Sequence, residues 1–170
     1  MFESFLKKYV LDNGVTTAIE TGTNQASTTR ILALHFNRVI SIELSEQLFS
    51  SAESMDFHHR KNVEFIHGDS RDYVSRLARE VKEPCFWYLD SHFCHITGNE
   101  VKSEFPLWQE LTAIQSRANP QDVIWIDDVH TFGKARPDLG QPWEDVTIDA
   151  LAAFFPERSS MVIADGLVLY

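Results

Sequence analysis

The chain has 170 residues, of which 44% are hydrophobic and 12% aromatic, enough to bury one sizeable core. Its formal net charge of -10 argues against a nucleic-acid partner, because binding the phosphate backbone depends on positive charge. Two cysteines are too few for a disulfide framework, and no stretch approaches the roughly 20 apolar residues of a membrane span. The chain start also lacks the features of a signal peptide. We therefore expect a soluble, cytoplasmic, single domain over residues 1–170.

Residues 1–14 predict an amphipathic N-terminal helix, because apolar side chains recur there at helical spacing and Gly14 follows where a helix would stop. From residue 15 to 170, short apolar runs alternate with longer segments that suit helices. The runs are Val15–Ile19, Val39–Ile42, Val63–Ile66, Cys85–Leu89 and Val123–Ile126. The helical segments are Gln25–Phe36, Ser45–Asp56, Ser70–Val81 and Glu104–Arg117. This order predicts an α/β fold with one Rossmann-like, doubly wound, mostly parallel sheet and helices on both faces.

The end of the chain predicts a change of strand direction. A last helix is expected over Trp143–Phe155, and MVIADGLVLY follows it, with Asp165-Gly166 between two short apolar runs like a tight hairpin turn. We therefore expect a C-terminal antiparallel pair. The least regular stretches are Ser91–Ser103 and Phe132–Pro142, and long loops in compact domains tend to be functional.

The stretch VTTAIETGTNQASTTRIL predicts a ligand-binding turn between the first strand and its helix. Glu20 and Gly22 fall at the carboxyl end of this strand, where open α/β sheets bind ligands. A pyrophosphate would need several glycines and would be repelled by a carboxylate at Glu20. The turn therefore suits a cationic or hydroxyl-rich ligand better than a dinucleotide.

Two further acidic residues follow at the ends of the next strands. Glu43 closes the second strand, about 20 residues on, which is the spacing at which an acidic residue reaches a ribose hydroxyl pair. Asp69 and Ser70 follow the third strand, within reach of an adenine edge. Together these residues predict an adenosine site without phosphates, and S-adenosylmethionine is such a ligand.

The runs IETGTNQASTTRILA, RVISIELSE, VEFIHGDSRDYV, FWYLDSH, PLWQELTAI, VIWIDDVHTFG and MVIADGLVLY resemble, in this order, the class I S-adenosylmethionine-dependent methyltransferases. Within that family, the chain is most similar to small members associated with polysaccharide biosynthesis. The resemblance implies methyl transfer from S-adenosylmethionine to a carbohydrate hydroxyl in a glycan or nucleotide-sugar. The predicted cofactor-binding residues are Glu20, Thr21, Gly22, Thr23, Asn24, Glu43, Leu44, Asp69, Ser70 and Asp90.

The ends of the fourth and fifth strands gather titratable groups for the chemistry. A hydroxyl nucleophile must lose its proton, and the candidate catalytic residues are Asp90, His92 and Asp128. Either His92 or a carboxylate removes the proton directly, or Asp90, Asp127 and Asp128 hold a divalent cation that lowers the pKa of the hydroxyl. The resemblance to related O-methyltransferases implies Mg2+ at these three acids. His130 is expected at the rim without a chemical role.

Other functions remain open at this level. A methyltransferase acting on a small phenol or amine is the alternative enzyme, and a non-catalytic binding module with this fold is the alternative outside catalysis. A nicotinamide-dependent oxidoreductase is disfavoured because the turn lacks the required glycines. The chain leaves little room for a substrate-covering insert. We expect a homo-oligomer, or neighbouring domains of a longer polypeptide from which this chain is excised, to supply that cover.

Overall fold

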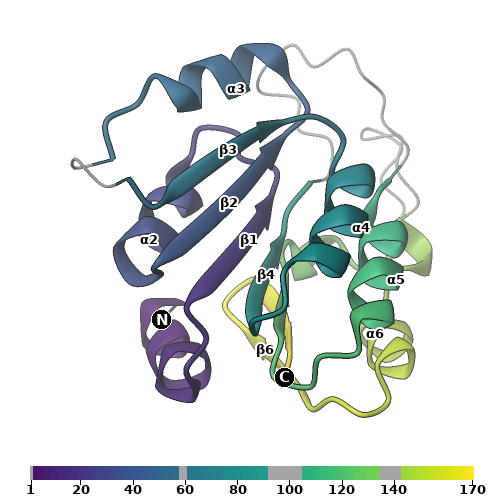
Figure 1. Cartoon of the computed structure of the whole chain (residues 1–170). Coiled ribbons are helices and arrows are strands. Elements are labelled where there is room, and N and C mark those ends of the chain that lie inside the picture. The colour runs from purple at the N-terminus through teal and green to yellow at the C-terminus, as the bar shows by residue number, and fades with distance from the viewer. Residues whose placement is uncertain (1, 58–60, 92–104, 135–142) are drawn as a thin grey trace.

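The computed structural model describes residues 2–57, 61–91, 105–134 and 143–170 (Figure 1). Seven strands form one sheet in the order β3-β2-β1-β4-β5-β7-β6. The strands are β1 (Thr17–Thr21), β2 (Arg38–Glu43), β3 (Val63–His67), β4 (Cys85–Leu89), β5 (Val123–Ile126), β6 (Ser160–Ile163) and β7 (Gly166–Leu169). The α-helices are α1 (Phe2–Phe5), α2 (Ser27–His35), α3 (Glu46–Glu53), α4 (Ser70–Glu80), α5 (Leu107–Arg117) and α6 (Ile148–Phe154). Shorter helical turns are η1 (Leu6–Val10), η2 (Leu11–Asn13), η4 (Val129–Thr131) and η5 (Trp143–Asp145).

The sheet confirms the predicted fold class. Strands β3, β2, β1, β4 and β5 pair in parallel, whereas β7 pairs antiparallel with β5 and β6 pairs antiparallel with β7. Because β1 pairs with both β2 and β4, the strand order reverses beside β1. Such a reversal opens a crevice at the carboxyl ends of the strands, which is the usual ligand site of an open α/β sheet.

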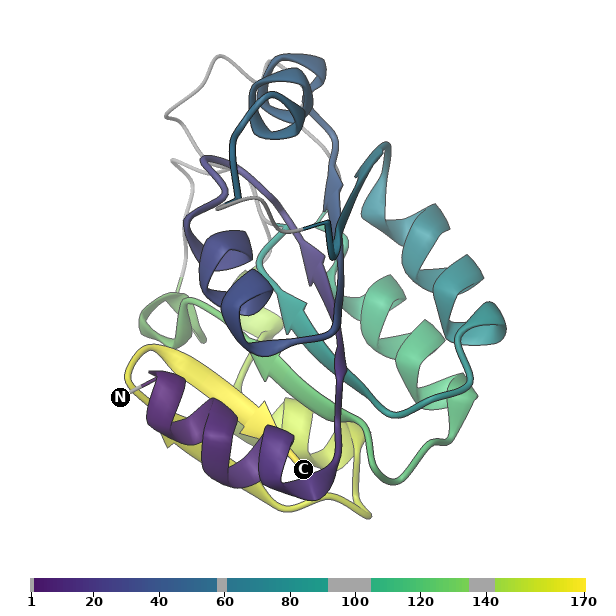
Figure 2. The ribbon, with the colours of Figure 1, turned by 60° about the vertical axis from the view of Figure 1, so that its left-hand side comes forward.

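Helices cover both faces of the sheet, and alternation along the strands assigns each side chain to a face (Figure 2). Ile19 and Trp87 belong to the core that contains residues of α4, α5 and α6. Ala18 and Phe86 belong to the core that contains residues of α1, η1 and α2. Helix α3 lies against the β2–β3 edge. Within the described ranges, none of the helices has the length and apolar character to cross a membrane.

The predicted bounds hold for β4 and β5 but not for the first strand. The expected strand Val15–Ile19 instead runs over Thr17–Thr21, so that Glu20 lies inside the strand and not beyond its end. Polar residues are tolerated in this buried strand because neighbouring hydroxyls satisfy them. The following helix begins at Ser27, not Gln25, because Asn24 (φ 48°) and Ala26 (φ 57°) adopt left-handed conformations that no helix continues.

The C-terminal hairpin is present, but its turn is shifted by one residue. Gly166 pairs with Ile163 as the first residue of β7, so Ala164 and Asp165 form the turn. A Cβ atom on Gly166 would lie 2.0 Å from Cε2 of Trp125, so the glycine is required by packing. The expected helix Trp143–Phe155 is divided into η5 and α6, and α6 starts where the Thr147 hydroxyl accepts from Ala150 N–H.

Candidate functional site

The turn after β1 lies at the centre of the carboxyl edge of the sheet. Gly22 has a φ of 81° and donates its N–H to the Ile42 carbonyl over 2.9 Å. A Cβ atom at this position would lie 2.2 Å from the carbonyl oxygen of Asp90. Only glycine therefore allows the turn to pass beneath the chain that leaves β4.

Glu43 connects the end of β2 to this turn. Its carboxylate oxygens accept from the backbone N–H of Asn24 and of Ser45, each over 2.8 Å. The side chain is buried, and Gly68 N–H donates to the Glu43 carbonyl. Glu43 thus holds two strand-end segments together, and each carboxylate oxygen retains a further lone pair for a ligand hydroxyl.

Glu20 lies beneath the turn and not on its open rim. Its Oε2 atom accepts from Thr29 Oγ1 over 2.5 Å and from Ser41 Oγ over 2.6 Å, and Ser41 is also 2.6 Å from Thr23 Oγ1. Burial raises the pKa of Glu20 to about 8, although the two hydroxyl bonds oppose the rise. Glu20 is therefore a neutral carboxylic acid near pH 7 that fixes the turn from below.

Asp69 and Ser70 lie where β3 passes into α4. The Asp69 carboxylate caps α4 by accepting from Arg71 N–H over 2.9 Å and also binds the Arg71 guanidinium. The bond from the Arg71 side chain holds the pKa of Asp69 below its usual value. Ser70 is buried. At the end of β3, Nε2 of His67 lies 3.1 Å from the carbonyl oxygen of Leu44.

Asp90 leaves the end of β4 beside the turn. Its N–H is 3.1 Å from the Thr21 carbonyl and 3.3 Å from Thr21 Oγ1. A small pocket opens here at the ends of β4 and β5. Its polar lining residues are Asp90, Ser91, Glu110 and Asp127. His92 lies outside the described residues, so its predicted role as a base stays a prediction.

The two acids after β5 point in different directions. Asp127 accepts from Tyr88 OH over 2.7 Å and from Trp125 Nε1 over 3.1 Å, and both rings belong to the core beside α2. Asp128 has a φ of 61° and lies 3.7 Å from Nδ1 of His130. Among the described residues, Asp90, Asp127 and Asp128 do not form one compact group of potential metal ligands.

Asp128 instead belongs to a group with His130 and Asp165, whose ligand atoms all lie within 4.8 Å of one another. Asp165, in the hairpin turn, accepts from His130 N–H over 2.9 Å and lies 2.6 Å from its Nδ1 atom. The hairpin reaches this place because β7 runs antiparallel beside β5. The donor set of two carboxylates and an imidazole suits a divalent cation.

Sequence reasoning missed Glu110, the buried acid of α5. Its side chain is 1% exposed, and Ser91 Oγ donates to its Oε1 over 2.7 Å. Helical periodicity could have predicted its burial, because Glu110 shares the buried face of α5 with Leu107, Leu111 and Ile114. An acidic residue in such a stripe indicates a polar partner inside the fold.

Comparisons with solved structures match the fold of the chain. An O-methyltransferase from Bacillus cereus, solved in complex with SAH, superposes with a TM-score of 0.65 at 20% identity, over 97% of this chain and 77% of that one. The O-methyltransferase TomG from Streptomyces achromogenes, involved in tomaymycin synthesis and solved with SAM, superposes with a TM-score of 0.61 at 19% identity, over 92% of this chain and 73% of that one. MycE from the mycinamycin biosynthetic pathway, in complex with Mg, SAH and mycinamycin VI, superposes with a TM-score of 0.65 at 13% identity, over 98% of this chain and 48% of that one.

The chain has the class I methyltransferase fold. At these identities the likeness establishes the fold alone. No family model matches the sequence, and no curated protein matches it.

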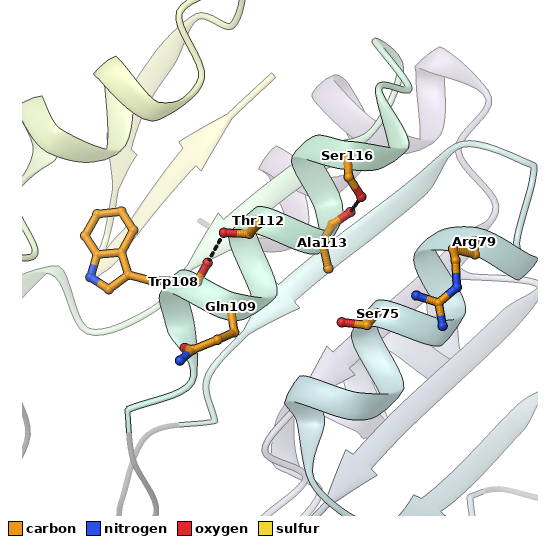
Figure 3. A pocket seen from close by; sticks show the side chains of 7 residues that line it. All are labelled: Ser75, Arg79, Trp108, Gln109, Thr112, Ala113 and Ser116. Carbon is orange, nitrogen blue, oxygen red and sulfur yellow. Dashed lines mark hydrogen bonds between the residues drawn. The ribbon is translucent and has the colours of Figure 1, made fainter.

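The methyltransferase fold of this chain also carries a groove of about 480 Å³ between α4 and α5 (Figure 3). Its lining residues are Ser75, Arg79, Trp108, Gln109, Thr112, Ala113 and Ser116. Thr112 and Ser116 donate to backbone carbonyls of their own helix, and the Trp108 ring packs against Phe154 of α6. Arg79 is the one charged residue among the seven, so the groove lacks the acids and bases that gather at the strand ends.

Proposed function

We propose that the protein is an S-adenosylmethionine-dependent O-methyltransferase. The observation that carries this proposal is the contact between Glu43, at the end of β2, and the Asn24 N–H in the turn after β1, over 2.8 Å. In a Rossmann-like sheet, an acid at this place meets the ribose hydroxyls of a nucleoside. The structures solved with SAH and SAM support the choice of nucleoside.

The side chain of Asn24 indicates which kind of ligand fits the turn. Its Oδ1 atom is buried and accepts no hydrogen bond from the described residues. A buried acceptor without a donor costs about 1–3 kcal/mol, so the turn favours a ligand that brings a donor. S-adenosylmethionine brings an ammonium group and two ribose hydroxyls. The turn therefore suits this cofactor better than it suits a pyrophosphate, which brings only acceptors.

The predicted cofactor residues other than Leu44 then have distinct tasks. Glu43 accepts from the ribose hydroxyls while it keeps the turn in place, and Asp69 and Ser70 flank the adenine. The backbone from Thr21 to Asn24, with Gly22 at its closest approach, contacts the methionine end. Glu20 supports the turn as a neutral acid, and Asp90 provides negative charge beside it.

The reaction requires an acceptor hydroxyl to lose its proton while it attacks in line. Bound S-adenosylmethionine supplies the methyl group on a sulfonium cation. Asp90, His92 and Asp128 are the residues that we propose to take or direct the proton. His130 joins them as a candidate, since Asp165 orients its ring through the 2.6 Å contact at Nδ1.

A divalent cation is the alternative to a side-chain base in this proposal. Asp90, Asp127 and Asp128 are the predicted Mg2+ ligands, but Asp127 already accepts from Tyr88 and Trp125. Asp128 is the ligand that we retain, with Asp165 and His130 as its nearest partners. A cation held there would lower the pKa of an acceptor hydroxyl. The structure of MycE, which was solved with Mg and SAH, supports this part of the proposal.

We propose a carbohydrate hydroxyl as the acceptor, on the resemblance to methyltransferases associated with polysaccharide biosynthesis. A small-molecule acceptor is the second candidate, because TomG is involved in tomaymycin synthesis and MycE was solved with mycinamycin VI. Methyl transfer to nucleotide-sugars or glycans, with none to catechols or amines, would favour the first. The opposite pattern would favour the second.

The deciding experiment is a calorimetric titration with S-adenosylhomocysteine. Wild-type protein should bind with micromolar affinity, and Glu43→Ala should lose that binding. Glu64→Gln, an exposed acid on the neighbouring strand β3, is the matched control and should bind like wild type. If wild-type protein does not bind the ligand, the methyltransferase proposal fails and the non-catalytic binding module becomes the better description.

A further inference from the structure

Glu110 lies deep in the fold yet reaches three hydroxyl groups. Its carboxyl accepts from Ser91 Oγ over 2.7 Å, and the hydroxyl groups of Ser70 and Thr21 lie close enough to influence its pKa. Burial raises the pKa of Glu110, and the three hydroxyl groups oppose that rise. An apolar residue here would continue the core face of α5, but it would leave the Ser91 hydroxyl without this acceptor.

The three hydroxyls come from three separate segments of the carboxyl edge. Thr21 ends β1, Ser70 begins α4 after β3, and Ser91 follows β4. Each of these residues belongs to the proposed site or adjoins it. Thr21 and Ser70 are proposed cofactor residues, and Ser91 follows Asp90. A single side chain from α5 thus connects the adenine end of the site to the end where Asp90 lies.

We propose that Glu110 is a positioning residue for the cofactor site, which sets the spacing between the β1 turn, the start of α4 and the chain after β4. The proposal rests on the proposed function. The close packing of the Asp90 carbonyl over Gly22 makes this spacing matter, because a shift of the chain after β4 would move the turn below it. Glu110 is 1% exposed at the wall of the small pocket beside Asp90, and it acts on the cofactor site through the hydroxyl groups.

Asp122 provides a comparison within the same chain. It is equally buried and accepts from Cys85 N–H, Trp87 Nε1 and Arg117 Nε. Cys85 begins β4, so this network lies at the amino end of the strands. A loss of stability should therefore follow from changes at either acid, whereas a loss of cofactor binding should follow only from changes at Glu110.

The test uses two substitutions of similar length and helix propensity. Glu110→Met removes the polar group, whereas Glu110→Gln keeps an acceptor for the hydroxyls. We expect the Kd for S-adenosylhomocysteine to rise about ten-fold in Glu110→Met and to stay within about three-fold of wild type in Glu110→Gln, as loss of buried hydrogen bonds implies. Asp122→Asn is the control and should lower the thermal midpoint without changing the Kd.

A second variant keeps the proposal testable if Glu110→Met does not fold. Ser91→Ala removes the 2.7 Å bond from the other side and should also raise the Kd. Wild-type affinity in folded Glu110→Met or in Ser91→Ala would overturn the positioning role, as would an equal loss in Asp122→Asn. These outcomes differ from failure of the proposed function, in which wild-type protein itself binds no S-adenosylhomocysteine and the inference falls with it.

Discussion

Gly22 and Asp90 are in backbone contact across the first and fourth strands, so close that a Cβ on Gly22 would lie 2.2 Å from the Asp90 carbonyl oxygen. The hydrogen bond from Asp90 N–H to the Thr21 carbonyl continues the β1–β4 pairing up to this point. The turn that would hold a cofactor and the segment that would hold the catalytic acid are therefore packed directly against each other. Gly22 is the position in this turn at which a side chain would collide with the chain after β4.

A first prediction concerns this contact. Gly22→Ala should destabilise the protein more than Gly14→Ala, because both glycines have a φ of 81° but only Gly22 has backbone against its missing Cβ. The left-handed conformation costs an alanine about 1–2 kcal/mol at either position, and the overlap should add about 1–3 kcal/mol at Gly22. Urea unfolding of both variants measures the difference in the free energy of unfolding. Equal losses of stability would show that the chain after β4 moves away from the added methyl group without a cost.

A second prediction concerns the pH dependence of stability. Burial raises the pKa of Glu20 from 4.5 to about 8. Between these values the folded protein retains a proton that the unfolded chain has released, so the contribution of Glu20 makes the free energy of unfolding fall as pH rises. Below the lower pKa this contribution is fully present, and above the higher one it is lost.

Glu20→Gln should remove this slope, because an amide keeps a neutral acceptor for Thr29 and Ser41 at every pH. Denaturant titrations across the range measure the slope of each protein. Glu53→Gln, at an exposed acid at the end of α3, is the control that should keep the wild-type slope. A wild-type slope in Glu20→Gln would show that Glu20 titrates normally.

Sequence reasoning could find the succession of strands along the chain and the place of Glu43, because both depend on local apolar runs and on spacing from the turn. It did not give the order of the strands in the sheet. It could not place Glu20, because the hydroxyls that allow its burial come from α2 and β2, remote in sequence. The alternation of side chains along a strand could have predicted a contact for Asp127, because Asp127 lies on the same face as Trp125, two residues earlier. The partnership of His130 with Asp165 depends on the antiparallel pairing of β7 with β5, whereas the sequence predicted only the pairing of the last two strands with each other.

A third prediction concerns the C-terminal hairpin. Gly166→Ala should cost about 1–3 kcal/mol, because its methyl group would overlap the Trp125 ring. Ala164→Gly in the same turn should be neutral or stabilising by up to about 1 kcal/mol, because Ala164 has a φ of 53° that glycine adopts without strain. Thermal unfolding of the two variants measures whether each substitution lowers or raises the stability. A loss in both would place the turn at Asp165-Gly166, as sequence reasoning expects.

A fourth prediction concerns the divalent cation. If Asp128 holds a cation with His130 and Asp165, removing divalent ions with EDTA should abolish methyl transfer while leaving S-adenosylhomocysteine binding intact, because Glu43 and the β1 turn need no metal. Asp165→Asn should raise the concentration of Mg2+ or Mn2+ needed for half-maximal activity. Asp145→Asn, in η5 outside this group, is the control and should leave that concentration unchanged.

The opposite result is equally informative about the chemistry. Full activity in EDTA would remove the cation from the proposal and leave the acceptor proton to a side chain. Asp165→Asn should then lower the rate by weakening the orientation of the His130 ring, which the 2.6 Å contact with the carboxylate provides. His130→Gln should lower it at least as far, because it removes the base itself. Unchanged rates in both variants would leave Asp90, His92 and Asp128 as the candidate bases.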